Sequence, residues 1–132
     1  MSGTVITFGT FDVFHVGHLR VIERAAALGD RLVVGVSADE LNLRKKGREP
    51  VFSQAERLAI VAALKPVDEV FVEESLELKR EYILERGADV LVMGDDWEGR
   101  FDEFRDICEV VYLTRTPAIS TTALIEKISS ST

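Results

Sequence analysis

Five short apolar segments alternate with helical segments along this chain of 132 residues. The apolar segments are residues 4–8, 31–36, 69–72, 90–93 and 109–113. Helical patterns or helix signals are found over residues 16–28, 37–43, 53–64, 76–86 and 120–128. Continuously apolar runs are typical of parallel strands that are buried on both faces. The order of segments therefore predicts an α/β fold, a Rossmann-like doubly wound five-stranded parallel sheet with helices on both faces.

Composition and length indicate one soluble domain over residues 1–132. Apolar residues are 46% of the chain and charged residues 30%, which is enough to build one core and an ordinary surface. The N-terminus lacks a basic flank before an apolar region, and no run approaches the ~20 apolar residues of a membrane span. We expect no signal peptide and no membrane insertion. Cys108 is the one cysteine of the sequence, so an internal disulfide cannot form. We expect it to be a small buried residue, and a single cysteine fits a cytoplasmic location.

The net charge of −7 argues against a nucleic-acid partner, because such binding depends on neutralising phosphates. A small phosphorylated ligand would need a local basic site. The one dense basic run is "RKKGRE", with Arg44, Lys45, Lys46 and Arg48, and taken alone it is expected to be a solvated loop.

Cap signals predict where several helices begin and end. Gly29 and Gly87 are expected to close the helices that precede them. Ser37 is expected to cap a short helix. Ser53 and Glu56 match a capping box, and Ser120 is expected to cap the last helix.

The residues that could carry chemistry follow strands. Residues 9–18 follow the first strand, residues 94–99 the fourth and residues 115–122 the fifth. In a parallel sheet the carboxyl ends of the strands share one edge, where ligands bind. These three segments are therefore expected to meet at that edge.

Both histidines, His15 and His18, lie in "GTFDVFHVGH", which leads from the first strand into a helix. The phosphate-loop and dinucleotide signatures are absent. A helix N-terminus suits an anion, two imidazoles one turn apart could both face that anion, and Gly17 would allow a nucleotide to approach the backbone closely. A metal pair is the rival interpretation, although a third ligand is not evident. A purely capping or packing role is the remaining one.

Two motifs about 100 residues apart resemble those of a known enzyme family. "HVGH" resembles the H-x-G-H signature of nucleotidyltransferases, which class I aminoacyl-tRNA synthetases share. "RTPAISTT", residues 115–122, resembles R-T-x-x-I-S-T-T of the cytidylyltransferase branch. "GTFD", "GDDWEG" and "CEVVYL" are similar to the members of that branch that use glycerol 3-phosphate, and the resemblance covers residues 4 to about 128.

The resemblance implies an activity, a cofactor and partners. An enzyme of this kind would convert CTP and glycerol 3-phosphate to CDP-glycerol and pyrophosphate, with Mg²⁺ as the cofactor. It would be a homodimer, and its product would suggest a precursor of teichoic acid. The acceptor's phosphate oxygen is already an anion when it attacks the α-phosphorus, so no general base is required. Catalysis then rests on positioning and on neutralising charge.

The resemblance also assigns roles to particular residues. The catalytic assignments are His15, His18, Lys45 and Arg115. The nucleotide assignments add Gly9, Thr10, Phe11, Gly17, Asp95, Thr116, Ile119, Ser120, Thr121 and Thr122. Lys45 and Lys79 are assigned to the acceptor. Three carboxylates could bind Mg²⁺ or the cytosine base of the nucleotide, and none of them is preferred: Asp12, Asp95 and Asp96.

Alternatives and departures accompany these assignments. A solvated helix face is an equal interpretation of Lys79. Trp97 could stack near the nucleotide or pack its loop, and packing is the favoured interpretation. The chain departs from the family pattern on the acceptor and subunit-contact side, at Gly47, Lys65, Pro66 and Leu76.

Two other functions remain open on the sequence. The chain could transfer a nucleotide to another acceptor, such as another polyol phosphate or, with ATP, FMN. It could instead be a regulatory module that binds CTP without turnover.

Overall fold

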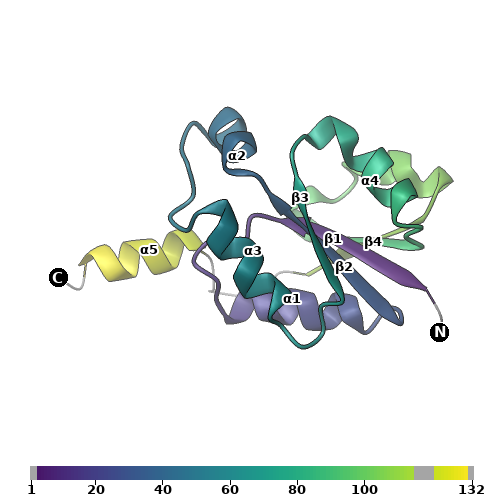
Figure 1. Cartoon of the computed structure of the whole chain (residues 1–132), viewed down its shortest axis with the longest axis horizontal. Helices are drawn as coiled ribbons and strands as arrows, with labels where there is room; N and C mark the ends of the chain where they lie inside the picture. The colour runs from purple at the N-terminus through teal and green to yellow at the C-terminus, as the bar shows by residue number, and fades with distance from the viewer. Residues whose placement is uncertain (1–2, 115–120, 131–132) are drawn as a thin grey trace.

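The computed structural model describes residues 3–114 and 121–130, and its centre is one parallel sheet (Figure 1). The strands are β1 (Thr4–Gly9), β2 (Arg31–Ser37), β3 (Glu69–Glu73), β4 (Val90–Gly94) and β5 (Glu109–Leu113). Their order is β3-β2-β1-β4-β5, and every neighbouring pair is parallel. The Rossmann-like sheet predicted from the apolar runs is therefore confirmed.

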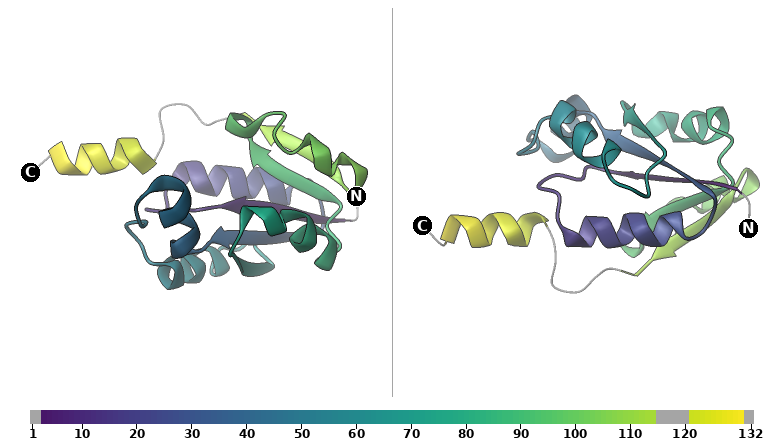
Figure 2. Two further views of the ribbon diagram at one scale, coloured as in Figure 1. Left: turned by 90° about the horizontal axis from the view of Figure 1, so that it is seen from above. Right: turned by 60° about the horizontal axis from the view of Figure 1, so that its bottom comes forward.

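Helices lie on both sides of the sheet, as Figure 2 shows from two directions. The α-helices are α1 (Val16–Ala26), α2 (Asp39–Lys46), α3 (Gln54–Ala62), α4 (Lys79–Glu85) and α5 (Thr121–Ser130). Three short 3₁₀ segments are η1 (Leu76–Leu78), η2 (Asp95–Trp97) and η3 (Asp102–Asp106). Within the part of the chain that the structure describes, no helix has the length and apolar character needed to cross a membrane.

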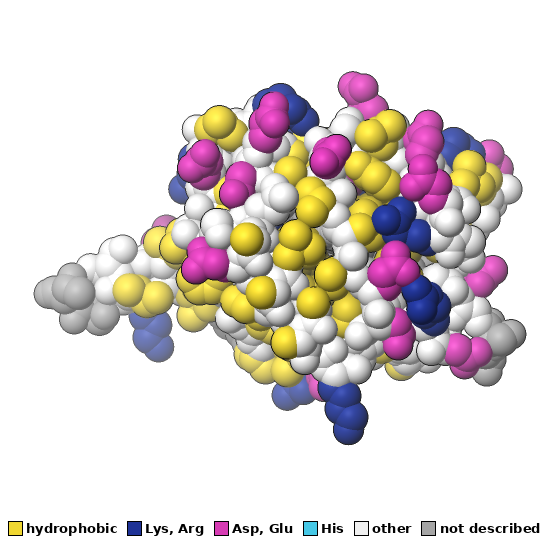
Figure 3. Space-filling view, viewed as in Figure 1, with side chains coloured by type: hydrophobic (Ala, Val, Ile, Leu, Met, Phe, Trp, Pro, Cys, Tyr) yellow, Lys and Arg dark blue, Asp and Glu magenta, His cyan; other side chains and the backbone are white. Residues whose placement is uncertain are grey.

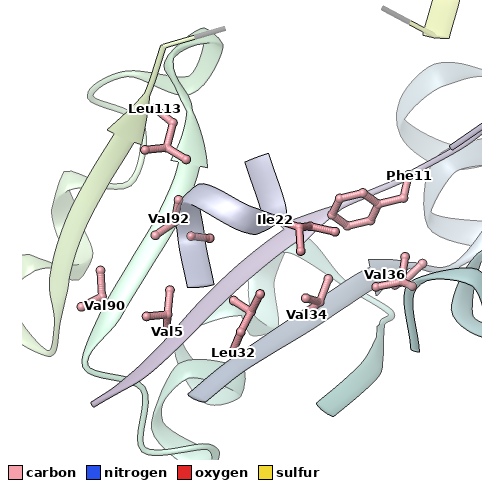
Figure 4. Packing of buried hydrophobic residues seen from close by; sticks show 11 residues of the cluster. Val5, Phe11, Ile22, Leu32, Val34, Val36, Val90, Val92 and Leu113 are labelled. Carbon is pink, nitrogen blue, oxygen red and sulfur yellow. The ribbon is translucent and has the colours of Figure 1, made fainter. Parts of the chain in front are cut away.

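Side chains that alternate along the central strands build a core on each face of the sheet. Val5 belongs to the core shared with Ile22 of α1 and Val61 of α3, as Figure 4 shows for Val5 and Ile22. Ile6, the next residue, belongs to the opposite core, which includes Ile83 of α4 and also residues of η3. Burial on both faces explains why these strands are apolar at successive positions.

Two cap predictions are confirmed and two are wrong. Ser53 and Glu56 form the expected capping box at the start of α3. Gly87 has φ +59° just beyond α4, a left-handed conformation that favours glycine. Gly29 does not cap α1, which ends at Ala26 with Ala27 as its cap. Instead, a Cβ at Gly29 would lie 2.6 Å from the carbonyl oxygen of Gly3, so this glycine permits close chain packing.

Ser37 is the last residue of β2, and α2 begins with Ala38 as a cap that makes no side-chain bond. The Ser37 hydroxyl is instead taken up in a buried polar cluster. The expected cap at Ser120 lies outside the described residues.

The basic run is not a loop. Arg44, Lys45 and Lys46 form the last turn of α2, which ends at Gly47 with φ +76°. Cations are favoured at that end of a helix, because the backbone carbonyls leave partial negative charge there. The expectation of a solvated loop is therefore corrected: a helix sets the direction of these three side chains.

A methyl group at Gly35 in β2 is expected to destabilise the fold. A Cβ there would lie 2.6 Å from the Phe8 ring and 2.8 Å from the Phe71 ring, which meet edge to face. Gly35→Ala should lower the free energy of unfolding by about 1–3 kcal/mol, the usual cost of overpacking. Urea denaturation measures this. Gly94→Ala is the matched control, because nothing lies within 4 Å of its added Cβ; equal losses in both variants would contradict the packing argument.

Candidate active site

The turn after β1, the first turn of α1 and the start of α5 lie together at the carboxyl edge of the sheet (Figure 1). The Thr121 hydroxyl at the start of α5 donates to the backbone oxygen of Asp12 at 3.0 Å. Two of the three predicted segments are thus brought together. Arg115, Thr116, Ile119 and Ser120 lie outside the described residues, as does the Thr122 side chain.

The turn after β1 has a strained backbone. Phe11 has φ +54° and Val13 has φ +46°, in a region that a β-branched residue rarely adopts. The Phe11 ring is buried in the core beside Ile22, which leaves its backbone for the site (Figure 4). A Cβ at Gly9 would lie 2.9 Å from that ring, so Gly9 makes room for it. Such strain is typical of functional turns that surrounding contacts hold in place.

Asp12 supplies many of these contacts. Its carboxylate accepts backbone N–H bonds from Val13 at 3.0 Å, from Phe52 at 2.8 Å and from Val51 at 2.8 Å. Both carboxylate oxygens therefore join the turn to the loop before α3. The structure gives Asp12 a role in holding backbone, which differs from the metal-ligand role considered on the sequence.

The two histidines cap α1 reciprocally. The backbone N–H of Gly17 donates to Nδ1 of His15 at 3.0 Å, and the backbone N–H of His15 donates to Nδ1 of His18 at 3.3 Å. A nitrogen that accepts a hydrogen bond carries no proton, so in each neutral ring the proton is on Nε2. Capping is therefore one role of both rings, and neither Nε2–H takes part in the cap.

Both imidazoles are neutral near pH 7. Burial, followed by the charge of His15, lowers the pKa of His18 from 6.5 to about 4, and Asp12 offsets part of this. Burial also lowers the pKa of His15. The rings stack with centroids 3.9 Å apart, and Nε2 of His15 is buried with no hydrogen-bond partner among the described residues. An unpartnered buried donor beside a helix N-terminus suits an anionic ligand.

These depressed values predict a loss of stability in acid. Between pH 6.5 and about 4 the unfolded chain binds a proton at His18 that the folded chain does not bind, so the free energy of unfolding falls as the pH falls. Its full contribution is on the order of 3 kcal/mol. Urea denaturation at pH 7 and pH 4.5 tests this against His18→Gln, which should lose most of the pH dependence; an equal dependence in both proteins would refute the assignment.

Positive charge gathers where α2 ends near the same turn. The Lys46 ammonium donates to the Thr10 hydroxyl at 3.4 Å. Burial, then the charges of Lys45 and Arg48, lower the pKa of Lys46, and Asp12 opposes this only in part. Mutual repulsion among exposed cations is relieved when an anion binds between them.

Beside α2 lies an open cavity of about 360 Å³. It is lined by Leu41, Arg44, Lys45, Ser75, Leu76 and Glu77. Lys45 lines this cavity and also belongs to the basic last turn of α2. The cavity therefore lies next to the cations in the last turn of α2.

Lys79 is not on a solvated face, so that alternative is wrong. The residue is only 3% exposed. Its ammonium contacts the Glu73 carboxylate at 2.7 Å and lies 3.8 Å from the centre of the Phe8 ring. Burial lowers the pKa of Lys79, while Glu73 opposes that shift and Lys45 adds to it. Lys79 and Lys45 are thus close enough to interact, with Glu73 acting on both.

The fully buried Arg57 was missed by the sequence reasoning. Its guanidinium donates to the carbonyls of Thr10 at 2.9 Å, Ser37 at 2.7 Å and Phe52 at 3.0 Å, and to the Asp39 carboxylate at 2.6 Å. Burial raises the pKa of Asp39, but bonds from Gln54 and Arg57 outweigh this and lower it. Arg57 therefore joins the ends of β1 and β2 to the loop before α3.

The segment after β4 carries the remaining assignments. Asp95 and Asp96 lie in η2. Trp97 packs against Phe101 with ring centroids 5.6 Å apart, as expected. Over residues 3–114 and 121–130, no group of three or more His, Cys, Asp or Glu side chains is arranged to hold a metal ion. Cys108 is only half-buried, and its thiol donates to Phe104.

Comparison with known proteins identifies the class. A family model described as cytidylyltransferase-like matches residues 6–131, and the chain belongs to this family. The resemblance drawn from the two motifs is confirmed.

The more particular likeness is to enzymes named glycerol-3-phosphate cytidylyltransferase. The chain is 50% identical over 125 residues to that of Bacillus subtilis strain 168, covering 95% of this chain and 96% of the relative. It is 45% identical over 126 residues to that of Bacillus spizizenii, covering 96% and 97%. A solved lipopolysaccharide core biosynthesis protein from Thermoplasma volcanium has a TM-score of 0.74 at 26% identity, covering 88% of this chain and 99% of that one.

Proposed function

We propose that this chain transfers CMP from CTP to glycerol 3-phosphate, giving CDP-glycerol and pyrophosphate. The likeness to the two Bacillus enzymes over nearly the whole chain carries the proposal. The paired Nε2–H donors at the start of α1 and the basic turn of α2 support it, since both suit a triphosphate.

The chemistry requires charge to be neutralised at the reacting phosphate. A phosphate oxygen of the acceptor forms a bond to the α-phosphorus, and the bond from that phosphorus to the bridging oxygen breaks, releasing pyrophosphate. His15 and His18 donate hydrogen bonds to the phosphate oxygens as charge builds up in the five-coordinate transition state. Lys46 and Lys45 neutralise the phosphates, and Arg115, Ser120 and Thr121 are proposed to hold the β and γ groups.

The acceptor is proposed to bind at the cavity beside Lys45. Its lining offers the cations Arg44 and Lys45 and the Ser75 hydroxyl, which suit a phosphate and a polyol. The buried Lys79 is close enough to Lys45 to interact with it, and the Glu73 carboxylate partly balances the charge of Lys79. Lys79 therefore contributes to the field at the acceptor.

Mg²⁺ is proposed as the cofactor. It keeps several waters and binds through substrate phosphates with one or two carboxylates, so a triphosphate can bring most of its ligands. Asp95, which follows β4, is a better candidate than Asp12, because backbone N–H groups already occupy both oxygens of the Asp12 carboxylate. When bound, the ion would neutralise phosphate charge.

We also infer that the chain acts in the cytoplasm, which its single cysteine fits, and that it forms a homodimer. Apolar side chains gather over the middle of the face in Figure 3, where α3 and the edge strand β3 lie. Exposed apolar surface at an unpaired edge favours burial by another chain. Analytical ultracentrifugation tests this, and a monomer at micromolar concentration would contradict it.

A nucleotide-by-acceptor matrix tests the activity. Pyrophosphate release is measured with CTP or ATP against glycerol 3-phosphate, other polyol phosphates and FMN, with Mg²⁺ present. Release that requires CTP and glycerol 3-phosphate together is the expected result. Preference for ATP with FMN would replace the proposal by adenylyl transfer, and CTP binding without turnover on any acceptor would indicate a regulatory module.

A further inference from the structure

The short helix α2 depends on polar contacts for its orientation. It spans eight residues, "DELNLRKK", and its buried residues are Leu41 and Asn42. Asp39 at its start bonds to Gln54 and Arg57, and Arg44 near its end donates to the backbone oxygen of Glu74. A helix with so little apolar surface is placed by its hydrogen bonds.

Asn42 makes the central set of these bonds. The residue is only 1% exposed, and its Oδ1 accepts from the Thr10 hydroxyl at 3.1 Å. Its Nδ2 donates to the Ser37 hydroxyl at 2.8 Å and to the Ala38 carbonyl at 3.0 Å. The Ser37 hydroxyl donates in turn to the Thr10 hydroxyl at 3.1 Å. This closed cluster, formed by Thr10, Ser37 and Asn42, ties α2 to the ends of β1 and β2.

Lys46 reaches the same cluster from the last turn of α2. It lies four residues after Asn42, on the same side of the helix. Its ammonium lies 3.4 Å from the Thr10 hydroxyl, which Asn42 also contacts. Asn42, which anchors the helix, and Lys46, one of the three cations of its last turn, therefore both contact the Thr10 hydroxyl in the turn after β1.

We propose that Asn42 is a positioning residue, which acts through the Thr10 hydroxyl to hold Lys46 beside the nucleotide turn. The inference rests on the proposed function for the identity of the ligand, a nucleoside triphosphate. Without the amide, α2 loses its bonds to the Thr10 and Ser37 hydroxyls, while the Asp39–Arg57 link at its start remains. The last turn of α2 is then no longer held in register with the histidine donors. Asn42 itself is buried and touches no substrate.

A double-mutant cycle tests this coupling. CTP affinity is measured by calorimetry for the wild-type chain, for Asn42→Ala, for Lys46→Ala and for the double variant. Each single change is expected to weaken CTP binding about tenfold. The double variant should be little weaker than Lys46→Ala alone, because Asn42 acts through Lys46. A loss equal to the product of the two single losses would overturn the proposal.

Two further variants separate positioning from stability. Thr10→Val keeps the shape of the side chain and removes the shared hydroxyl, so it should weaken CTP binding as Asn42→Ala does, and it serves if Asn42→Ala fails to fold. Glu40→Ala, on the exposed side of α2, should change CTP affinity less than about twofold, since Glu40 pairs only with the surface residue Arg44 among the bonds described. Urea denaturation is measured on every variant. Reduced stability with unchanged CTP affinity in both Asn42→Ala and Thr10→Val would show a merely structural role.

The readout keeps this inference separate from the acceptor. If the wild-type chain binds CTP but does not use glycerol 3-phosphate, the proposed acceptor fails, while the cycle still decides the role of Asn42. If the wild-type chain does not bind CTP, both the proposed function and this inference fail.

Discussion

His15→Asn is expected to lower turnover by about 10²–10³ while leaving the stability of the fold nearly unchanged. Asparagine is among the best N-cap residues and can accept the Gly17 N–H that Nδ1 accepts now. It cannot supply a donor at the position of Nε2, and one transition-state donor accounts for a loss of this size. His18→Gln is its counterpart, because glutamine at the third helical position can complete a capping box. Pyrophosphate release and urea denaturation are measured on both.

His15→Ala separates the two functions of the ring. It should lose the same turnover and, in addition, about 1 kcal/mol of stability, because the cap is removed as well. The capping box of α3 provides a matched control: Ser53→Ala should cost a similar amount of stability with little change in turnover. Turnover near the wild-type value in both His15→Asn and His18→Gln would contradict the assigned donors.

Arg57→Ala is expected to produce the largest loss of stability, about 3–5 kcal/mol. The change removes a fully buried guanidinium and leaves three carbonyls and the Asp39 carboxylate without their donor. Groups stripped of a buried charged partner carry a cost of this order. Arg57→Lys should recover only part of it, since one ammonium cannot serve acceptors in so many directions.

Chemical denaturation gives the size of this effect. Arg20→Ala is the control, because it breaks an exposed pair with Glu23 and should cost less than about 1 kcal/mol. A loss from Arg57→Ala as small as that of Arg20→Ala would show that solvent or neighbouring donors replace the guanidinium.

The fold was readable from the sequence because its main signal is local. Strands buried on both faces must be apolar at successive positions, and β1, β2 and β4 are. Caps depend partly on distant contacts. Gly87 has the left-handed conformation that its position suggested, whereas Gly29 is required by the nearby chain at Gly3, a contact that no local pattern reveals.

The meeting of candidate segments at one sheet edge was predicted where motif and topology agreed. The approach of Thr121 to the turn after β1 follows from strand ends that share an edge. The burial of Arg57, Asn42 and Lys79 could not be predicted, since each resembles an ordinary polar residue of a surface helix. Their partners lie on other elements, and only the assembled fold brings a carboxylate or a carbonyl to them.

The central position of β1 has a consequence for the order in which the chain assembles. Val5 pairs with Leu32 on one side and with Val90 on the other, so the second pairing closes a roughly threefold longer loop, at an entropic cost only about 1 kcal/mol higher. The region from β1 to β3 can therefore associate early, with β4 and β5 docking later onto a prepared edge. On a ribosome, where synthesis runs from the N-terminus, the turn that carries both imidazoles would emerge long before the strands that complete the sheet beside it.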